Sequence, residues 1–319
     1  MVIIPLIIIF KKPKTKVQKI LLTLFALFLI TAQNSISSPT GTIKGKIKVD
    51  GKERSYVLYT SKGYYLNDKN LPLLIAIHGR LGSGNQLMKA SGFNKIADRE
   101  DFIVVYPDGY RKGWADGRGE TPSDKEGIND VKFITMLIDK LQEKYRIDSN
   151  KIFACGHSNG GAMSHRLGFD ISDRLAGIAP VGANVSSDMV KNFSSKRQIP
   201  VLLINGTADE FIPFEGGEGK STGYIYPPVM DIFNKWKEYN GCEEDVSPDT
   251  VDMHDDGTVA LIYNFDNCTS KPVKLIKILD AGHSYPGGDP DLPQWLVGRY
   301  TKEVNASEEI WKFFKESME

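Results

Sequence analysis

Six short runs of apolar residues alternate along this chain with segments of helical length. The runs cover residues 71–77, 102–106, 152–155, 175–181, 201–204 and 273–279. Continuous apolar runs of this length are typical of strands that are buried on both faces of a sheet. Because helix-length segments separate them, the sequence predicts an α/β fold in which helices cover both faces of a mostly parallel sheet.

The segments between and before the runs support this arrangement. Helices are predicted over residues 85–98, 129–145, 161–167, 229–239 and 307–315. In the second of these, apolar residues recur at every third or fourth position, which is typical of a helix packed on a sheet. Upstream, residues 42–49 and 53–59 alternate in polarity around Asp50-Gly51 and predict an antiparallel N-terminal hairpin.

The length and charge of the chain limit its domain organisation and its partners. The 319 residues, of which 41% are hydrophobic, can bury one large core, and no period of repeat length recurs. We therefore predict a single domain over residues 42–319, with an insertion at about 211–268. With 40 basic and 40 acidic residues the formal charge is zero, so no general field attracts nucleic acid.

The N-terminal segment has the pattern of a secretory signal. Five lysines precede the apolar run 20–30 and the small-residue exit Thr31-Ala32. The run is shorter than the roughly 20 residues that a membrane span needs. We predict a signal peptide at residues 1–32, a linker at 33–41, secretion to the extracellular space or periplasm, and no stable membrane insertion after cleavage. An uncleaved anchor remains the alternative, because residues 2–10 are also apolar.

The pentapeptide Gly156-His157-Ser158-Asn159-Gly160 follows the apolar run 152–155 and precedes a stretch of small residues. A G-x-S-x-G pattern between a strand and a helix is typical of a nucleophilic serine held on a sharp, strained turn. The neighbours two positions before and after such a serine must lack bulk, and glycine meets that requirement. The pattern therefore makes Ser158 a candidate nucleophile.

A nucleophilic serine needs a base that takes its proton and an acid that orients the base. Of the five histidines, only His283 follows a late apolar strand, where a loop can deliver it to the carboxyl edge of the sheet. Asp209 lies just past the buried run 201–204. The order serine, aspartate, histidine is that of α/β-hydrolases. We predict Ser158 as nucleophile, His283 as base and Asp209 as acid.

Acyl transfer also needs donors for the developing oxyanion. The backbone N–H of Asn159 follows the nucleophile directly and is one candidate. The second is the N–H of Arg80, in the glycine-containing loop 78–82 that follows the first buried run. A turn that only ends the strand is the alternative for this loop.

The three cysteines differ in their surroundings. Cys242 and Cys268 both lie in the polar C-terminal third, whereas Cys155 ends a buried-looking strand beside Ser158. We predict a disulfide between Cys242 and Cys268 and a buried free thiol at Cys155. No CxxC or Cys/His spacing typical of zinc is present, so we predict no metal site.

Eight short motifs follow one another in a fixed order from about residue 71 to the C-terminus. They cover residues 78–82, 106–109 with Trp114, 129–133, 156–161, 206–209, 213–217, 236–242 and 282–288. As a set they resemble the secreted polyhydroxybutyrate depolymerase and feruloyl esterase group of α/β-hydrolases. The match is specific because so many spaced motifs occur in order.

The resemblance implies the α/β-hydrolase fold and a serine esterase that works through Ser158, Asp209, His283 and an acyl-enzyme, without a cofactor. It also implies the disulfide between Cys242 and Cys268. The implied substrates are feruloyl or acetyl esters of polysaccharides, or short polyhydroxyalkanoate esters, in soluble or polymeric form.

The chain departs from the group at Arg80-Leu81, at His157 and at Tyr285, where relatives often carry other residues. These positions concern the oxyanion loop and the pocket wall, so they affect substrate preference more than reaction type. We predict an aromatic pocket wall from Trp114, Tyr285 and Trp295. Core packing or surface covering is the alternative for each of these three rings.

Two other functions remain open at this point. A serine peptidase on the same fold would need His283 to protonate a poorer leaving group. A binding protein that lost catalysis would keep the fold and lack a working triad.

Overall fold

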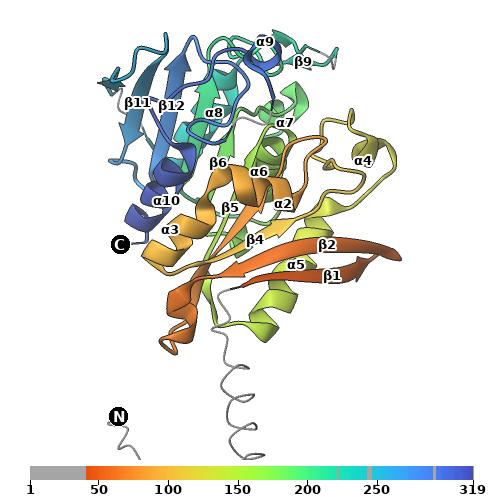
Figure 1. Ribbon diagram of the computed structural model, residues 1–319. Coiled ribbons are helices and arrows are strands. Elements are labelled where there is room, and N and C mark those ends of the chain that lie inside the picture. Colours follow the sequence, from red (N-terminus) through yellow and green to blue (C-terminus); the bar gives the residue numbers. More distant parts are fainter. Residues whose placement is uncertain (1–40, 221–222, 243–245, 290–291, 319) are drawn as a thin grey trace, which may run out of the picture. The chain divides into compact units, whose positions relative to one another are not determined.

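The computed structural model describes residues 41–319 apart from 221–222, 243–245, 290–291 and 319, and this part of the chain is built on one ten-stranded sheet (Figure 1). The predicted signal peptide and residues 33–40 of the predicted linker lie outside the described residues. Within the described ranges, no helix is both long enough and apolar enough to cross a bilayer.

The sheet has a parallel centre and antiparallel edges. Its strand order is β1-β2-β4-β3-β5-β6-β7-β12-β11-β10, and the strands from β4 to β12 in this order pair in parallel. The hairpin β1–β2 at one edge and β11–β10 at the other are antiparallel. The predicted sheet class and N-terminal hairpin are therefore confirmed. The bounds are β1 (Thr42–Val49), β2 (Lys52–Thr60), β3 (Leu71–Ile77), β4 (Ile103–Pro107), β5 (Ile147–His157), β6 (Gly177–Val181), β7 (Val201–Gly206), β10 (Asp249–Val251), β11 (Val259–Phe265) and β12 (Val273–Leu279).

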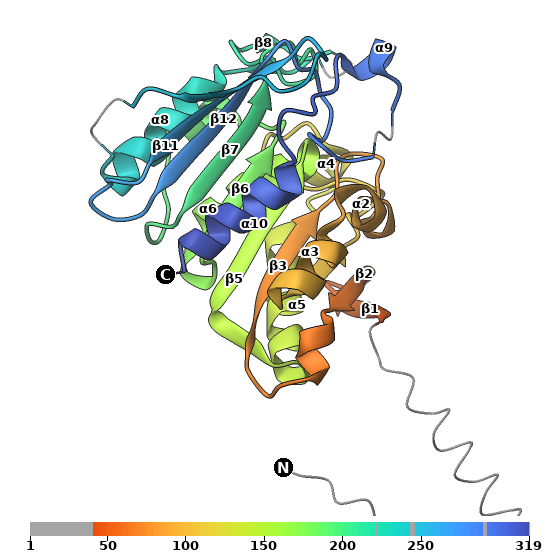
Figure 2. The same ribbon diagram turned by 60° about the vertical axis from the view of Figure 1, so that its left-hand side comes forward.

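Helices cover both faces of the sheet because successive strand residues point to opposite sides. In β3, Leu73, Ile75 and Ile77 belong to one core, and Leu74 and Ala76 belong to the other. The first core is closed by α5 (Asp130–Lys144), α6 (Asn159–Asp170) and α8 (Val229–Asn240). The second is closed by α2 (Gly84–Ser91), α3 (Phe93–Glu100) and α10 (Ala306–Glu316), of which α3 and α10 lie across the near face in Figure 2.

Short elements complete the connections. They are η1 (Lys62–Tyr65), α4 (Pro122–Lys125), η2 (Ser172–Arg174), α7 (Ser187–Lys191), α9 (Gln294–Val297) and the two-stranded sheet of β8 (Gly217–Glu218) and β9 (Ile225–Tyr226).

The elements differ from the prediction at α2–α3 and at β11, and β10 was not predicted either. The single helix predicted over 85–98 is two helices, α2 and α3, because Gly92 between them has a left-handed backbone with a φ of 69°. Glycine adopts this conformation readily and commonly ends a helix. Strand β11 was not predicted, although residues 259–263 form an apolar run; the strand is only partly buried.

The segment predicted as an insertion, about 211–268, contributes to the sheet and to the first core. Strand β11 pairs along its length with β12, and β10 extends the sheet by one more strand. Helix α8 buries Phe233 and Trp236 completely or nearly so. These elements are therefore integral to the described unit, while the small β8–β9 sheet forms a separate pair.

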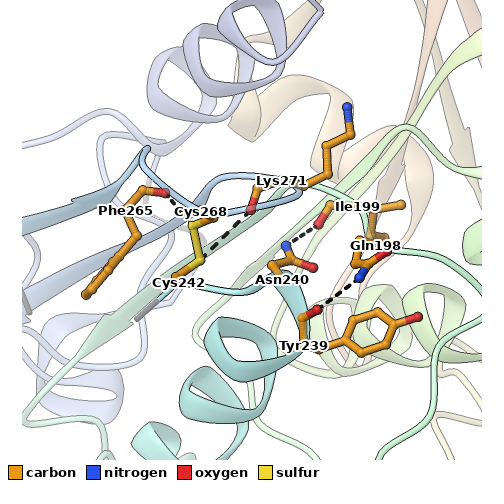
Figure 3. Close-up of a disulfide and its surroundings, with 8 residues drawn as sticks. All are labelled: Gln198, Ile199, Tyr239, Asn240, Cys242, Phe265, Cys268 and Lys271. Carbon is orange, nitrogen blue, oxygen red and sulfur yellow. Dashed lines mark hydrogen bonds between the residues drawn. A yellow bond between two sulfur atoms is a disulfide. The ribbon is translucent and has the colours of Figure 1, made fainter. Parts of the chain in front are cut away.

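The disulfide between Cys242 and Cys268 joins the loop after α8 to the loop after β11, which confirms the predicted pairing (Figure 3). Beside it, the side-chain amide of Asn240 donates a hydrogen bond to the carbonyl of Ile199, at 2.8 Å, and so fixes the end of α8 to the start of β7. Cys155 is a buried free thiol, as predicted.

Removing the disulfide should lower stability. A cross-link over a loop of this size raises the free energy of unfolding by about 3 kcal/mol, chiefly by restricting the unfolded chain. We expect a Cys242→Ser, Cys268→Ser double variant to lose about this amount in urea unfolding, and reduced wild type to behave like the variant. In denaturant without reductant, alkylation should label Cys155 alone; three labels would contradict the bond.

Candidate active site

Ser158 lies at the tip of a strained turn between β5 and α6. Its backbone has a φ of 56° and a ψ of −122°, a conformation that costs on the order of 1–3 kcal/mol for a residue with a side chain. The Ser158 N–H donates to the carbonyl of Val181 on β6, at 2.9 Å. A Cβ atom on Gly156 would overlap Gly160, and one on Gly160 would overlap the carbonyl oxygen of Ile77. The close approach of β3, β5 and α6 therefore requires both glycines.

The structure brings the three predicted triad residues together at the carboxyl edge of the sheet. The Nε2 atom of His283 is 2.8 Å from Ser158 Oγ, and its Nδ1 atom is 2.7 Å from Asp209 Oδ2. The three residues follow β5, β7 and β12, whose carboxyl ends meet at one edge because the strands are parallel. Asp209 is 3% exposed and His283 is 9% exposed. This arrangement can transfer a proton from the serine hydroxyl to the imidazole.

The second oxygen of Asp209 is held by the turn that follows it. The N–H groups of Phe211 and Ile212 both donate to Asp209 Oδ1, at 2.8 Å each. These bonds fix the carboxylate so that Oδ2 faces His283. The sequence signal for these bonds is an aspartate at the start of a turn, since aspartate side chains commonly accept hydrogen bonds from backbone N–H groups two or three residues later.

Three contacts position the imidazole of His283. Its backbone N–H donates to the carbonyl of Val297, at 2.6 Å, and this bond connects the loop after β12 to the end of α9. The ring of Phe211 stacks beside it, with 5.1 Å between ring centroids, and the ring of His157 lies 5.0 Å away. Phe211 was not among the predicted site residues, because the sequence of a loop does not show which side chain a phenylalanine in it will contact.

His157 places a neutral second imidazole next to His283. Burial, followed by the proximity of His283, lowers the pKa of His157 to about 3. Its Nε2 atom is buried and has no hydrogen-bond partner in the described ranges. The edge of the Tyr285 ring packs against it, while the Tyr285 hydroxyl bonds to the hydroxyl of Ser307, at 2.8 Å. His157 and Tyr285 thus pack as one group behind the imidazole of His283.

The loop 78–82 passes directly beside Ser158. A Cβ atom on Gly79 would lie 3.4 Å from Ser158 Cβ. The backbone N–H groups of Arg80 and Asn159, the predicted oxyanion donors, have no acceptor among the residues that the structure describes. Free donors of this kind, next to a serine at the start of a helix, suit a developing negative charge.

His78 holds this loop in place. Its Nε2 atom accepts a hydrogen bond from the N–H of Gly109, at 2.9 Å, so its proton is on Nδ1 and is donated to the carbonyl of Gly79, at 2.7 Å. Burial lowers the pKa of His78, which keeps the ring neutral. The histidine therefore has a positioning role.

Trp114 connects the loop to the turn at Ser158. Its indole N–H donates to the carbonyl of His78, at 2.9 Å, and its backbone N–H donates to Oδ1 of Asn159, at 2.8 Å. The Asn159 amide also donates to Asp116 Oδ2, at 2.6 Å. Trp114 is fully buried, so it packs beneath the site and does not form an open pocket wall. Of the other predicted wall residues, Trp295 is 81% exposed on α9.

A protein-family model matches the part of the chain that contains the turn at Ser158. Residues 68–226 match the family model described as Phospholipase/Carboxylesterase. The chain has the α/β-hydrolase fold. Its fold class is the one that the motifs predicted.

Three curated relatives cover different parts of this α/β-hydrolase. The putative esterase NocK of Nocardia uniformis subsp. tsuyamanensis is 31% identical over 59% of this chain and 54% of its own length. The bifunctional acetylxylan esterase/xylanase XynS20E of Neocallimastix patriciarum is 26% identical over 72% of this chain and 32% of its own. The probable feruloyl esterase C of Aspergillus niger is 25% identical over 92% and 96%. The chain thus spans about half of NocK and about a third of XynS20E.

Gly160→Ala should destabilise the protein strongly. The added methyl group meets the backbone oxygens of Ile77, at the end of β3, and of His78, which no side-chain rotation can move away. We expect the free energy of unfolding to fall by at least about 3 kcal/mol, at the upper end for overpacking. Urea unfolding measures the change, with Gly41→Ala as control because its methyl group would meet nothing within 4 Å. A loss below about 1 kcal/mol would show that β3 and α6 are not in close contact.

His157 should make the protein less stable in acid. Its pKa of about 3 lies below the ordinary value of 6.5, so between these pH values the unfolded chain binds a proton that the folded protein does not. The contribution of the neutral His157 to the free energy of unfolding is therefore complete above pH 6.5 and is lost as the pH falls toward 3. We expect His157→Leu to reduce the pH slope of the free energy of unfolding by about 1.4 kcal/mol per pH unit between pH 6 and pH 4. Equal slopes would contradict the buried neutral state.

Proposed function

We propose that this α/β-hydrolase is a secreted carboxylic-ester hydrolase in which Ser158 is the nucleophile. The observation that carries the proposal is the continuous hydrogen-bonded path from Ser158 Oγ through His283 to Asp209, with steps of 2.8 and 2.7 Å, at a strained turn. The relatives described as esterases support the reaction class.

The first half-reaction forms an acyl-enzyme. Ser158 Oγ attacks the ester carbonyl carbon while His283 Nε2 takes the hydroxyl proton. The carbonyl oxygen becomes an oxyanion that accepts hydrogen bonds from the N–H groups of Arg80 and Asn159. The intermediate then collapses, the bond to the alcohol oxygen breaks, and His283 returns the proton to the departing alcohol.

The second half-reaction releases the acid. Water attacks the acyl carbon with His283 as base, the bond to Ser158 Oγ breaks, and the serine regains its proton. In both halves His283 is transiently cationic. Asp209 stabilises this cation, and the neutral state of His157 avoids a second positive charge 5.0 Å away.

Esters of polysaccharides are the substrate class that the relatives favour. One relative is named as an acetylxylan esterase and another as a feruloyl esterase, so acetyl and feruloyl esters are the first substrates to test. Hydroxybutyrate oligomers belong in the same panel, since the motif resemblance also covers polyester depolymerases.

Secretion fits the cysteine chemistry. A disulfide such as Cys242–Cys268 persists in oxidising compartments and is rare in reducing ones. Together with the predicted signal peptide, it supports an extracellular or periplasmic enzyme.

Ser158→Ala should abolish ester hydrolysis. Removing a triad nucleophile costs on the order of 10⁴-fold or more in kcat. We would measure turnover of p-nitrophenyl acetate, methyl ferulate, acetylated xylan and hydroxybutyrate oligomers. Ser284→Ala is the matched control, because Ser284 follows His283 in a second Gly-His-Ser sequence but has no place in the proton path. Unchanged turnover in Ser158→Ala would disprove the assignment.

The same proteins test the two rival functions. A peptidase would cleave a peptide panel and leave the aryl esters intact. A binding protein without catalysis would turn over none of the esters in its wild-type form.

A further inference from the structure

A cavity of about 530 Å³ lies beside α6, away from the triad. Its walls come from the loop after β4, from the second half of α6, from α7 and its flanks, and from the loop that precedes β9. No triad residue lines it. We call this cavity the α6 groove; its wall includes Arg118, Arg166, Asp188, Asn192 and Tyr224.

The α6 groove is joined to the candidate active site through two side-chain contacts. Arg118, in the groove wall, pairs with Asp116, with 3.0 Å between Nε and Oδ1. Asp116 in turn accepts a hydrogen bond from the amide of Asn159, the residue after the nucleophile. Along α6, the eight residues from Ser158 to Arg166 correspond to about 12 Å. An oligosaccharide of several units is long enough to span that distance.

The charges of the groove wall balance. It contains two arginines, Arg118 and Arg166, and two aspartates, Asp170 and Asp188. Arg166 pairs with Asp170, at 3.2 Å, and Arg118 pairs with Asp116. Both arginines are therefore already paired with carboxylates, so the wall offers no excess positive charge to an anion. A ligand without an anionic group suits it best.

The remaining wall is polar, with a few apolar faces. Serines, the Asn192 amide and the charged groups offer both donors and acceptors, and the rings of Tyr224 and Phe169 offer flat apolar surface. A sugar has hydroxyl groups that both donate and accept, and apolar C–H faces that pack on such rings. A polyester backbone has only acceptors, so the acceptors of the groove would gain no hydrogen bond from it, at a cost for each such group removed from water.

The part of the wall around Tyr224 is held rigidly. The guanidinium of Arg118 lies 5.9 Å from the ring of Tyr224, and it also bonds to the hydroxyl of Tyr226. Only 8% of the Arg118 side chain is exposed. A wall fixed in advance loses little entropy when a ligand binds.

We propose that the α6 groove is a subsite for the carbohydrate part of a polysaccharide ester. The inference rests on the proposed ester hydrolysis at Ser158 and names the substrate class of that site. Binding in the groove would hold sugar units that lie about 12 Å from the nucleophile, beyond the alcohol oxygen of the reacting ester, so that remote binding energy serves the reaction of saccharide esters and not that of small esters.

Binding of an ester-free sugar tests the groove without catalysis. We would titrate Ser158→Ala protein with an unesterified xylo-oligosaccharide by calorimetry, alone and combined with Tyr224→Ala or Asn192→Ala. We expect saturable binding that each groove variant weakens at least five-fold. Tyr65→Ala, which removes a tyrosine outside the groove wall, is the matched control and should bind like its parent.

Absence of saturable binding would overturn the proposal, and so would binding that neither groove variant changes. Binding of hydroxybutyrate oligomers in place of the sugar would assign the groove to a polyester instead. Thermal unfolding of each variant shows whether it is folded; Asn192→Ala removes an exposed side chain and keeps the test valid if Tyr224→Ala does not fold.

Kinetics separate this inference from the proposed function. With otherwise wild-type protein, Tyr224→Ala and Asn192→Ala should lower kcat/KM for a feruloylated xylo-oligosaccharide at least five-fold and change it less than two-fold for methyl ferulate. If the two esters respond equally, the subsite is wrong and ester hydrolysis stands. If wild type hydrolyses neither, the proposed function is wrong and the titration alone decides on the groove.

Discussion

The structure depends on one strained residue, Ser158, whose backbone turns sharply between β5 and α6. The strain persists because the neighbouring glycines allow β3, β5 and α6 to approach until backbone meets backbone. The bond from Ser158 N–H to Val181 then ties the turn to β6. As a result the serine hydroxyl stands at the carboxyl edge of the parallel strands, where the loops after β7 and β12 bring Asp209 and His283.

A network of buried polar groups converts this edge into a fixed site. His78 and Trp114 bond the loop 78–82 to the chain after β4, and Asn159 bonds that chain to the start of α6. Each such bond contributes about 1 kcal/mol net, but a buried group left without its partner costs more, so the network holds as a unit. Burial keeps His78 neutral, and it keeps His157 neutral as well.

The sequence indicated which residues meet at this edge of the sheet better than it indicated their surroundings. Ser158, Asp209 and His283 could be found because each follows an apolar run, and parallel strands place such ends at one edge. The contacts of Phe211 with His283 could not, because apolar periodicity reports burial and not the direction of a ring in a loop. For the same reason Trp114 was predicted as a pocket wall although it is buried. Gly92 shows a third limit of the sequence pattern. The apolar periodicity predicts one helix, but the left-handed backbone of Gly92 divides it into α2 and α3.

Asn159 links the two parts of the molecule that a polysaccharide ester would occupy. Its backbone N–H points toward the reacting carbonyl in the proposed mechanism, while its side chain bonds to Trp114 and Asp116, and Asp116 pairs with Arg118 of the α6 groove. Since both ends of the Asn159 amide group are bonded in the protein without substrate, the oxyanion donor needs no reorganisation when an ester arrives, which is the condition under which such donors act most strongly. The contacts that shape the groove therefore also hold the donor, so a substrate that fits the groove meets a site already set for its ester.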